Sequence, residues 1–367
     1  MVAATRSTRS ITSKSIKKET VNTVIGSPSK PTKATQKKKV VLTNEVVEEF
    51  KTPPSSPSKK KNASPKKVNV ELEDALGHII VPKDLSLPKE FAEFHRPEFI
   101  DGVKHIIKTD PTLYPVIVYK NFPLYAVAGS TDTKVPQTEA DILQSYWYAL
   151  ISGIISQQVS GAAALSIENK FNMLFGPEGT KNATPELVLQ KTHEELRGAG
   201  LSNKKVEYVQ NISEHFINPK DNKLARLEFY ENSSDEEISE ELILLKGIGP
   251  WSIKMFLTFT LNRFNVFAFD DLGVARGSYR YLNRRKSLLE KIKKEVKKDE
   301  ALTKLLSRKS KFAASKGKRD WTPYHDVYIA KLGEEFEPYQ SIMMMLLWRL
   351  SSTNVDVLAG TTGKNPN

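Results

Sequence analysis

Apolar residues recur at helical spacing over most of the chain beyond residue 85. The strongest run in the first half of the chain covers residues 141–160, where Ile142, Tyr146 and Ile154 fall on one side of a helix. This segment is too apolar for an exposed helix, so we expect it in the core. It ends in two polar side chains, Gln157-Gln158, as an ordinary helix end followed by a turn would.

Two further helical segments flank a pair of glycines, Gly247 and Gly249. Residues 235–245 begin with acidic side chains and then carry apolar ones at helical spacing, and residues 252–261 place apolar side chains on one face. The pattern predicts a helix, a tight glycine turn and a second helix. The amides around Gly249 to Ser252 open that second helix and suit a phosphate, without reading a base edge. A plain helical hairpin with no ligand fits the same residues.

Two adjacent carboxylates, Asp270 and Asp271, follow the short apolar run of residues 267–269. A carboxylate held beside a sugar can stabilise a transition state with oxocarbenium character. An aspartate at the start of a helix is also an ordinary N-cap, and the spacing alone does not separate the two roles.

The positive charge is confined to one end of the chain. Residues 1–67 contain 16 lysines and arginines and 4 acidic residues, whereas the remainder is formally neutral. With few large apolar side chains, residues 1–84 are predicted to be a disordered basic tail. Lysine clusters at residues 37–39 and 59–61 are typical of nuclear import, although a solvated linker or a mitochondrial presequence also fits. We therefore expect a nuclear protein, with a mitochondrial form as the alternative.

Several classes of site are excluded by composition. The chain has no cysteine, which rules out disulfides and any cysteine-ligated metal or iron–sulfur cluster. Its six histidines lack the spacing of a metal-binding pair, so we expect no metal site. No run approaches the roughly 18 apolar residues of a membrane span, and we expect no membrane partner.

Four blocks of sequence, in this order, carry a family resemblance. They are IISQQVS at 154–160, LRGAGLSNKK at 196–205, the pair LKGIGPWSIKMF and FAFDDLGVARG within 245–277, and PYQSIMMMLLWR at 338–349. Through them the chain resembles the helix-hairpin-helix (HhH-GPD) superfamily of DNA glycosylases, and most closely the fungal enzymes for 3-methyladenine and other alkylated bases. The resemblance extends over residues 113–354.

The resemblance implies an all-α fold. Two helical subdomains would carry a helix-hairpin-helix motif beside an active-site cleft. We expect the glycosylase domain to span residues 85–356, with a basic inserted loop at 299–320. A flexible tail would follow at 357–367. Lys204 and Lys205, at the start of another predicted helix, would face either a phosphate or solvent.

The resemblance also assigns roles to individual residues. Asp271 would be the catalytic carboxylate, with Asp270 as the runner-up, and Trp251 and Trp348 would line the base pocket. A second group would bind the DNA backbone: Gly247, Ile248, Gly249 and Ser252. Gln158 would intercalate into the duplex, with Val159 as the second choice.

The function implied is a monofunctional glycosylase. It would flip alkylated purines such as 3-methyladenine and 7-methylguanine out of double-stranded DNA and hydrolyse their N-glycosidic bonds, which initiates base excision repair. Family members with AP-lyase activity carry lysine where this chain has Trp251, so we expect none. We also expect a monomer that requires no cofactor, and leave open a monovalent cation at the hairpin. The alternatives are a non-enzymatic DNA-binding protein and a glycosylase for other damaged bases.

Overall fold

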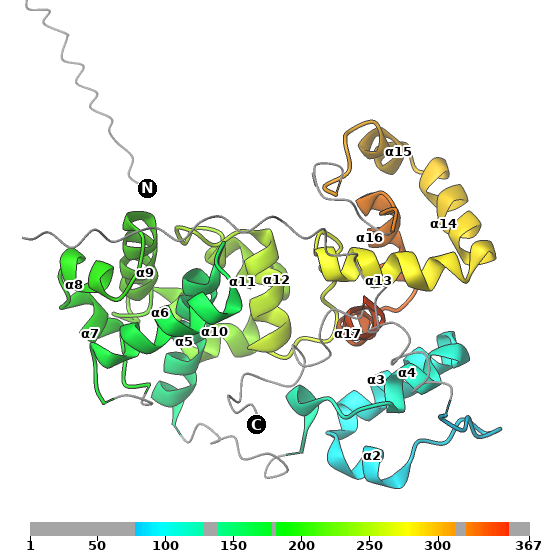
Figure 1. Ribbon diagram of the computed structural model, residues 1–367, viewed down its shortest axis with the longest axis horizontal. Coiled ribbons are helices and arrows are strands. Elements are labelled where there is room, and N and C mark those ends of the chain that lie inside the picture. The colour runs from blue at the N-terminus through cyan, green and yellow to red at the C-terminus, as the bar shows by residue number, and fades with distance from the viewer. Residues whose placement is uncertain (1–77, 128–137, 178–180, 313–320, 352–367) are drawn as a thin grey trace, which may run out of the picture. The chain divides into compact units, whose positions relative to one another are not determined.

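The computed structural model describes residues 78–127, 138–177, 181–312 and 321–351 (Figure 1). The chain divides into two units at residues 63 and 64, and every described residue belongs to the second. Within these ranges the structure contains helices and no strand, so the predicted all-α fold is confirmed. The predicted tails lie outside the described residues, except for 78–84. None of the described helices is long and apolar enough to cross a membrane.

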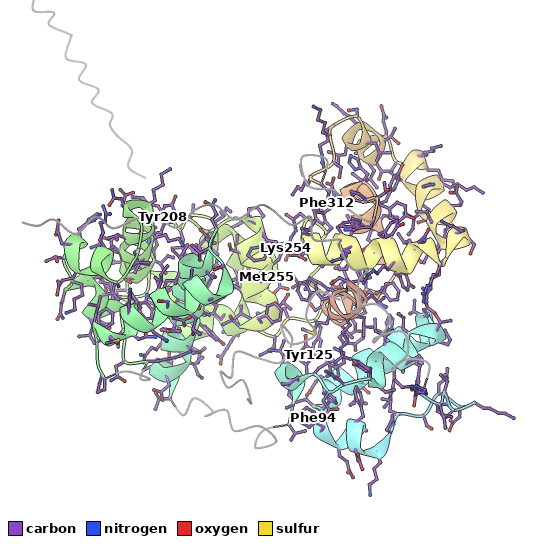
Figure 2. All side chains as sticks on the ribbon, in the orientation of Figure 1. Phe94, Tyr125, Tyr208, Lys254, Met255 and Phe312 are labelled. Carbon is purple, nitrogen blue, oxygen red and sulfur yellow. The ribbon has the colours of Figure 1, made fainter. Side chains whose placement is uncertain are left out.

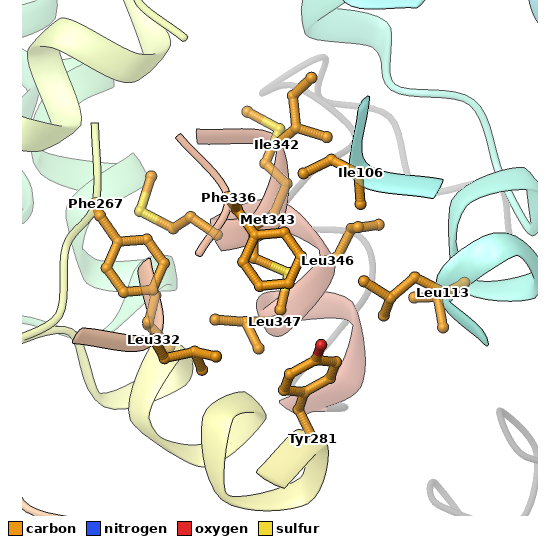
Figure 3. Packing of buried hydrophobic residues seen from close by; sticks show 14 of the residues in the cluster. Ile106, Leu113, Phe267, Tyr281, Leu332, Phe336, Ile342, Met343, Leu346 and Leu347 are labelled. Atoms are coloured by element: carbon orange, nitrogen blue, oxygen red, sulfur yellow. The ribbon is translucent and has the colours of Figure 1, made fainter. Parts of the chain in front are cut away.

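One group of buried side chains joins the first and last helices. It draws on α2 (Lys89–Phe94), α3 (Pro97–Thr109), α4 (Tyr114–Val118), α13 (Leu272–Asn283), α14 (Lys286–Lys298), α16 (Asp326–Glu334) and α17 (Gln340–Ser351), with short 3-10 turns η1 (Pro111–Leu113) and η2 (Pro123–Tyr125). Helix α17 runs through the middle of this core. Its Met343 and Leu346 pack against Phe336 and Ile106 (Figure 3), so the methionine run serves packing.

A second buried cluster lies among the central helices. These are α5 (Glu139–Ser156), α6 (Gly161–Met173), α7 (Pro185–Leu189), α8 (His193–Gly198), α9 (Asn203–His215), α10 (Leu227–Asn232), α11 (Asp235–Leu242) and α12 (Pro250–Phe259), with 3-10 turn η3 (Lys223–Ala225). The predicted core helix is α5, which begins at a capping box formed by Thr138 and Asp141. It ends at Ser156, and Gln157 already leaves the helix.

Helices α13 and α17 pack unusually closely. A Cβ atom added at Gly277 would lie 2.0 Å from the carbonyl oxygen of Leu347. Only glycine allows this approach of two backbones. The contact fixes the end of α17, including Trp348, against the start of α13.

The interval predicted as a basic inserted loop contains a helix, α15 (Glu300–Leu306). Asp299 caps it by accepting a hydrogen bond from the Leu302 amide at 3.0 Å, and Leu302 packs against the first core. Beyond the helix, Arg308 forms an ion pair with Asp326, which is fully buried. The prediction of a loop is therefore wrong for this part, because a cap and apolar side chains favour a helix. Residues 313–320 lie outside the described chain.

Candidate active site

Asp271 is both the cap of a helix and the centre of a polar cluster. Its Oδ1 accepts from the Val274 amide at 2.9 Å, which starts α13, and from the Trp348 indole Nε1 at 2.8 Å. Its Oδ2 accepts from the Trp251 indole at 3.1 Å. The two interpretations of Asp271 are therefore compatible: one oxygen caps the helix, while the other faces an exposed side chain.

Trp348 is held on its edge and on its face. The nitrogen edge contacts Asp271, and the ring stacks on Phe259 of α12 with centroids 5.6 Å apart and planes inclined by 18°. The ring also lies over Gly273, where an added Cβ would be 2.7 Å from Trp348 Cδ1. Together these contacts bring Trp348 to the carboxylate from 77 residues away along the chain.

Trp251 completes an aromatic surface beside the carboxylate. It lies in the first turn of α12 and remains 46% exposed, which leaves much of its indole free to contact a ligand. Phe259 and Leu272 are 38% and 54% exposed. A group of exposed apolar side chains marks a binding site more often than single exposed ones do. The cluster thus offers an apolar surface next to an anionic oxygen.

Asp270 points into a different environment. Its carboxylate forms ion pairs with Lys254 Nζ at 2.9 Å and Lys311 Nζ at 3.0 Å, and it is 10% exposed. Burial alone would raise the pKa of Asp270, but the hydrogen bonds and charges of the two lysines outweigh burial and leave it below its usual value. Both ammonium groups also lie over the Phe269 ring, at 4.0 and 5.3 Å from its centroid. Asp270 is therefore paired with two cations, whereas the Asp271 carboxylate accepts from two indoles and an amide.

The turn between α11 and α12 has the predicted conformation. Gly247 has a φ of +85°, and a Cβ there would lie 2.3 Å from the Tyr208 ring. Both observations require glycine. Gly249 is the N-cap of α12, so the amides of Trp251 and Ser252 precede the first helical hydrogen bonds and point outward as donors.

Ile248 does not fit the role assigned to it. Its side chain is 7% exposed and belongs to the second core, and its amide donates to the Leu245 carbonyl at 3.2 Å. The amide is used within the turn and the side chain is buried, so both observations argue against the backbone-binding role that the resemblance assigned to Ile248. The residue anchors the hairpin to the second core.

The loop after α5 presents two exposed side chains. Gln158 has a φ of +58°, and both Gln158 and Val159 are exposed. Gln157 points the other way, and its side-chain amide donates to the Gly247 carbonyl at 3.0 Å. The two residues proposed to intercalate are therefore exposed to solvent, and the loop that carries them contacts the hairpin through Gln157.

Sequence reasoning missed several residues that shape the site: Phe259, Gln157, Lys254 and Lys311. Their roles depend on contacts between distant segments, and only one had a local signal. Phe259 lies eight residues after Trp251, which places both near one face of α12. Among the described residues, no group of three or more histidine, aspartate or glutamate side chains could hold a metal ion. The groups that the structure brings together at this site are a carboxylate, aromatic rings and helix amides.

The sequence of the chain is similar to those of known DNA repair proteins. Residues 151–336 match the family model described as HhH-GPD superfamily base excision DNA repair protein. The DNA-3-methyladenine glycosylase of Saccharomyces cerevisiae is 35% identical over 285 residues, which cover 76% of this chain and 88% of that protein. DNA-3-methyladenine glycosylase 1 of Schizosaccharomyces pombe is 36% identical over 135 residues, or 37% of this chain and 57% of that one.

A solved structure of a Schizosaccharomyces pombe 3-methyladenine DNA glycosylase with abasic DNA is also similar. It is 24% identical and covers 68% of this chain and 95% of its own, with a TM-score of 0.44.

Proposed function

This chain belongs to the HhH-GPD superfamily of base excision DNA repair proteins, and we propose that it is a DNA glycosylase that releases alkylated purines. One observation carries the proposal. The Asp271 carboxylate accepts hydrogen bonds from two indoles, Trp251 and Trp348, that come from different helices and line one aromatic surface. A helix cap alone would require neither indole.

Substrate binding begins with the DNA backbone. The amides at the start of α12 would bind a phosphate, since helix N-termini favour anions. The glycosidic bond of a stacked nucleotide is out of reach, so the damaged nucleotide must leave the duplex before it reacts. Gln158, or Val159 beside it, would occupy the gap that remains.

The aromatic surface suits a particular class of base. Methylation at N3 or N7 gives a purine a positive charge, and a cation lying over an indole is stabilised by about 0.5–2 kcal/mol. Trp251 is exposed and available for such stacking, and Phe259 backs Trp348. Neutral damaged bases would gain less from this surface, and we therefore propose cationic purines such as 3-methyladenine and 7-methylguanine as substrates.

The positive charge also explains the chemistry. A cationic base leaves without protonation, so no general acid is needed. As the bond breaks, positive charge develops on the sugar, and the Asp271 carboxylate would stabilise it. Oδ1 is committed to the cap and to Trp348, which leaves Oδ2, next to exposed Trp251, to face the sugar or orient water.

The proposed products are a free base and an intact strand with an abasic site. Strand cleavage by the family's lyases uses a lysine amine that forms an imine with the sugar. The corresponding residue here is Trp251, whose indole cannot form one. We propose that the protein acts in the nucleus as a monomer on double-stranded DNA. No cofactor would be required, because a cationic base leaves without protonation and the Asp271 carboxylate would stabilise the sugar.

The test is base release from methylated duplex DNA, with strand breaks measured before and after alkali. We expect free 3-methyladenine and 7-methylguanine, and strand breaks only after alkali. Breaks without alkali would contradict the monofunctional mechanism. Binding to DNA with no release from any alkylated substrate would instead support a non-enzymatic DNA-binding protein.

A further inference from the structure

Helix α9 touches both loops that we propose to contact DNA. At its start, Lys205 Nζ donates to the carbonyl oxygens of Ile155 and Gln157 at 2.7 and 2.8 Å. These carbonyls end α5 and precede Gln158. A cation is favourable there, since the last carbonyls of a helix lack amide partners and carry partial negative charge. Lys205 thus donates to the end of α5, a contact that the sequence, which suggested only a phosphate or solvent, did not reveal.

Two further residues of α9, Tyr208 and Asn211, contact the hairpin. Tyr208, marked on α9 in Figure 2, places its ring against Gly247, where a Cβ would approach within 2.3 Å. Asn211 Oδ1 accepts from the Lys246 amide at 2.8 Å. Because the three side chains follow each other at intervals of three residues, they form a continuous row along the helix.

The two loops are also joined directly. Gln157 donates to the Gly247 carbonyl at 3.0 Å, which closes a ring of contacts from α9 to one loop, across to the hairpin, and back to α9. Gln158 needs such support because its φ of +58° is unfavourable for a residue other than glycine.

We propose that Lys205 is a positioning residue for base extrusion: through α9 it fixes the intercalating loop relative to the hairpin that binds the backbone. This inference rests on the proposed function. Extrusion must overcome the stacking and pairing of the target nucleotide. A side chain that enters the duplex at a fixed distance from the bound phosphate loses little ordering freedom on binding, whereas a loose loop would lose more.

The test compares Lys205→Met with Lys204→Met in the full-length protein. Both variants remove one positive charge from the first turn of α9, but Lys204 is exposed, so its loss controls for the general electrostatic effect on DNA binding. Extrusion is followed by the fluorescence of 2-aminopurine placed beside the lesion, and chemistry by single-turnover release of 7-methylguanine. Each is measured with the lesion either paired in a duplex or unpaired in a bulge.

For Lys205→Met we expect extrusion and release from the paired lesion to fall by at least about 10-fold, because small misplacements at a reacting site are costly. The bulged lesion needs less extrusion and should lose much less. Gln157→Leu, which breaks the direct link, should show the same selectivity, and Lys205→Arg should restore most of the rate. These two variants test the inference even if Lys205→Met lowers stability.

Equal rates for Lys205→Met and Lys204→Met would overturn the inference, as would equal losses on paired and bulged lesions. Either result would leave the proposed function intact, provided that the wild-type protein releases base. Failure of the wild type to release base would instead contradict the proposed function itself.

Discussion

Replacing Gly273 by alanine should reduce activity strongly and lower stability only slightly. Gly273 is the second residue of α13, and its Cα lies beneath the Trp348 ring. An alanine Cβ would be 2.7 Å from Trp348 Cδ1, 3.0 Å from Nε1 and 3.1 Å from Asp271 Oδ1. The first of these distances is too short for any real contact, so the ring must move. Its hydrogen bond to Asp271, now 2.8 Å, would lengthen or break.

Two opposing effects set the change in stability. Alanine is favoured over glycine in a helix by about 0.5–1 kcal/mol. A lost hydrogen bond to a charged acceptor costs about 1.5–3 kcal/mol, and we take the lower end because both partners are only half-buried. The unfolding free energy should therefore fall by about 1 kcal/mol. Activity should fall 10- to 100-fold, since an error of about 1 Å at a reacting site has effects of that size.

Two other glycines provide matched controls. Gly153 lies in α5, and an added Cβ there has no neighbour within 4 Å. Gly153→Ala should therefore raise the free energy of unfolding by about 0.5–1 kcal/mol and keep full activity. At Gly277 an added Cβ would meet the backbone of Leu347, so Gly277→Ala should lower the free energy of unfolding by about 1–3 kcal/mol or more. Urea unfolding and single-turnover base release test all three. Activity of Gly273→Ala within twofold of wild type would refute the argument.

Three further predictions concern the groups around the site and the core. Burial, assisted by the nearby positive charge of Arg349, lowers the pKa of His95 from 6.5 to about 4, although the hydrogen bond of its ring to the Phe91 carbonyl acts in the opposite direction. As the pH falls, the unfolded chain therefore takes up the proton before the folded protein does. His95 contributes about 3 kcal/mol to the free energy of unfolding above pH 6.5, and this contribution is lost as the pH falls to 4. In urea unfolding, the stability difference between wild type and His95→Gln should shrink by that amount, and a constant difference would contradict the assignment. Arg349 is 2% exposed and donates to four backbone carbonyls, so Arg349→Met should cost at least about 3 kcal/mol in unfolding experiments; a loss below 1 kcal/mol would be inconsistent with those bonds. Asp270→Asn should slow single-turnover release less than about 10-fold, because Asp270 binds lysines and not the aromatic surface; a loss as large as that of Asp271→Asn would move the catalytic role to Asp270.

Features encoded within a few residues were predictable from the sequence. The hairpin followed from two glycines between segments of helical spacing, and Gly247 indeed adopts a positive φ. The cap at Asp271 followed from its place before an apolar helical pattern. Both are decided by local backbone geometry, which neighbouring residues largely determine.

Features that depend on tertiary packing were not predictable in this way. The contact of Trp348 with Asp271 needs α13 and α17 to approach at Gly277, and the sequence showed only two glycines four residues apart, Gly273 and Gly277. The engaged amide of Ile248 and the pairing of Lys205 with the end of α5 likewise involve hydrogen bonds that residue type does not specify. The helix within the predicted 299–320 loop was missed because the many basic residues of that interval concealed the short apolar face of Leu302 and Leu306.

The most direct test of the central claim is single-turnover release of 7-methylguanine by Asp271→Asn at saturating enzyme. Asparagine caps a helix about as well as aspartate, so α13 should persist while the negative charge is lost. We expect Asp271→Asn to bind methylated duplex DNA with near wild-type affinity and to release base at least about 100-fold more slowly. Release at the wild-type rate would show that Asp271 is only a helix cap and that the catalytic carboxylate lies elsewhere.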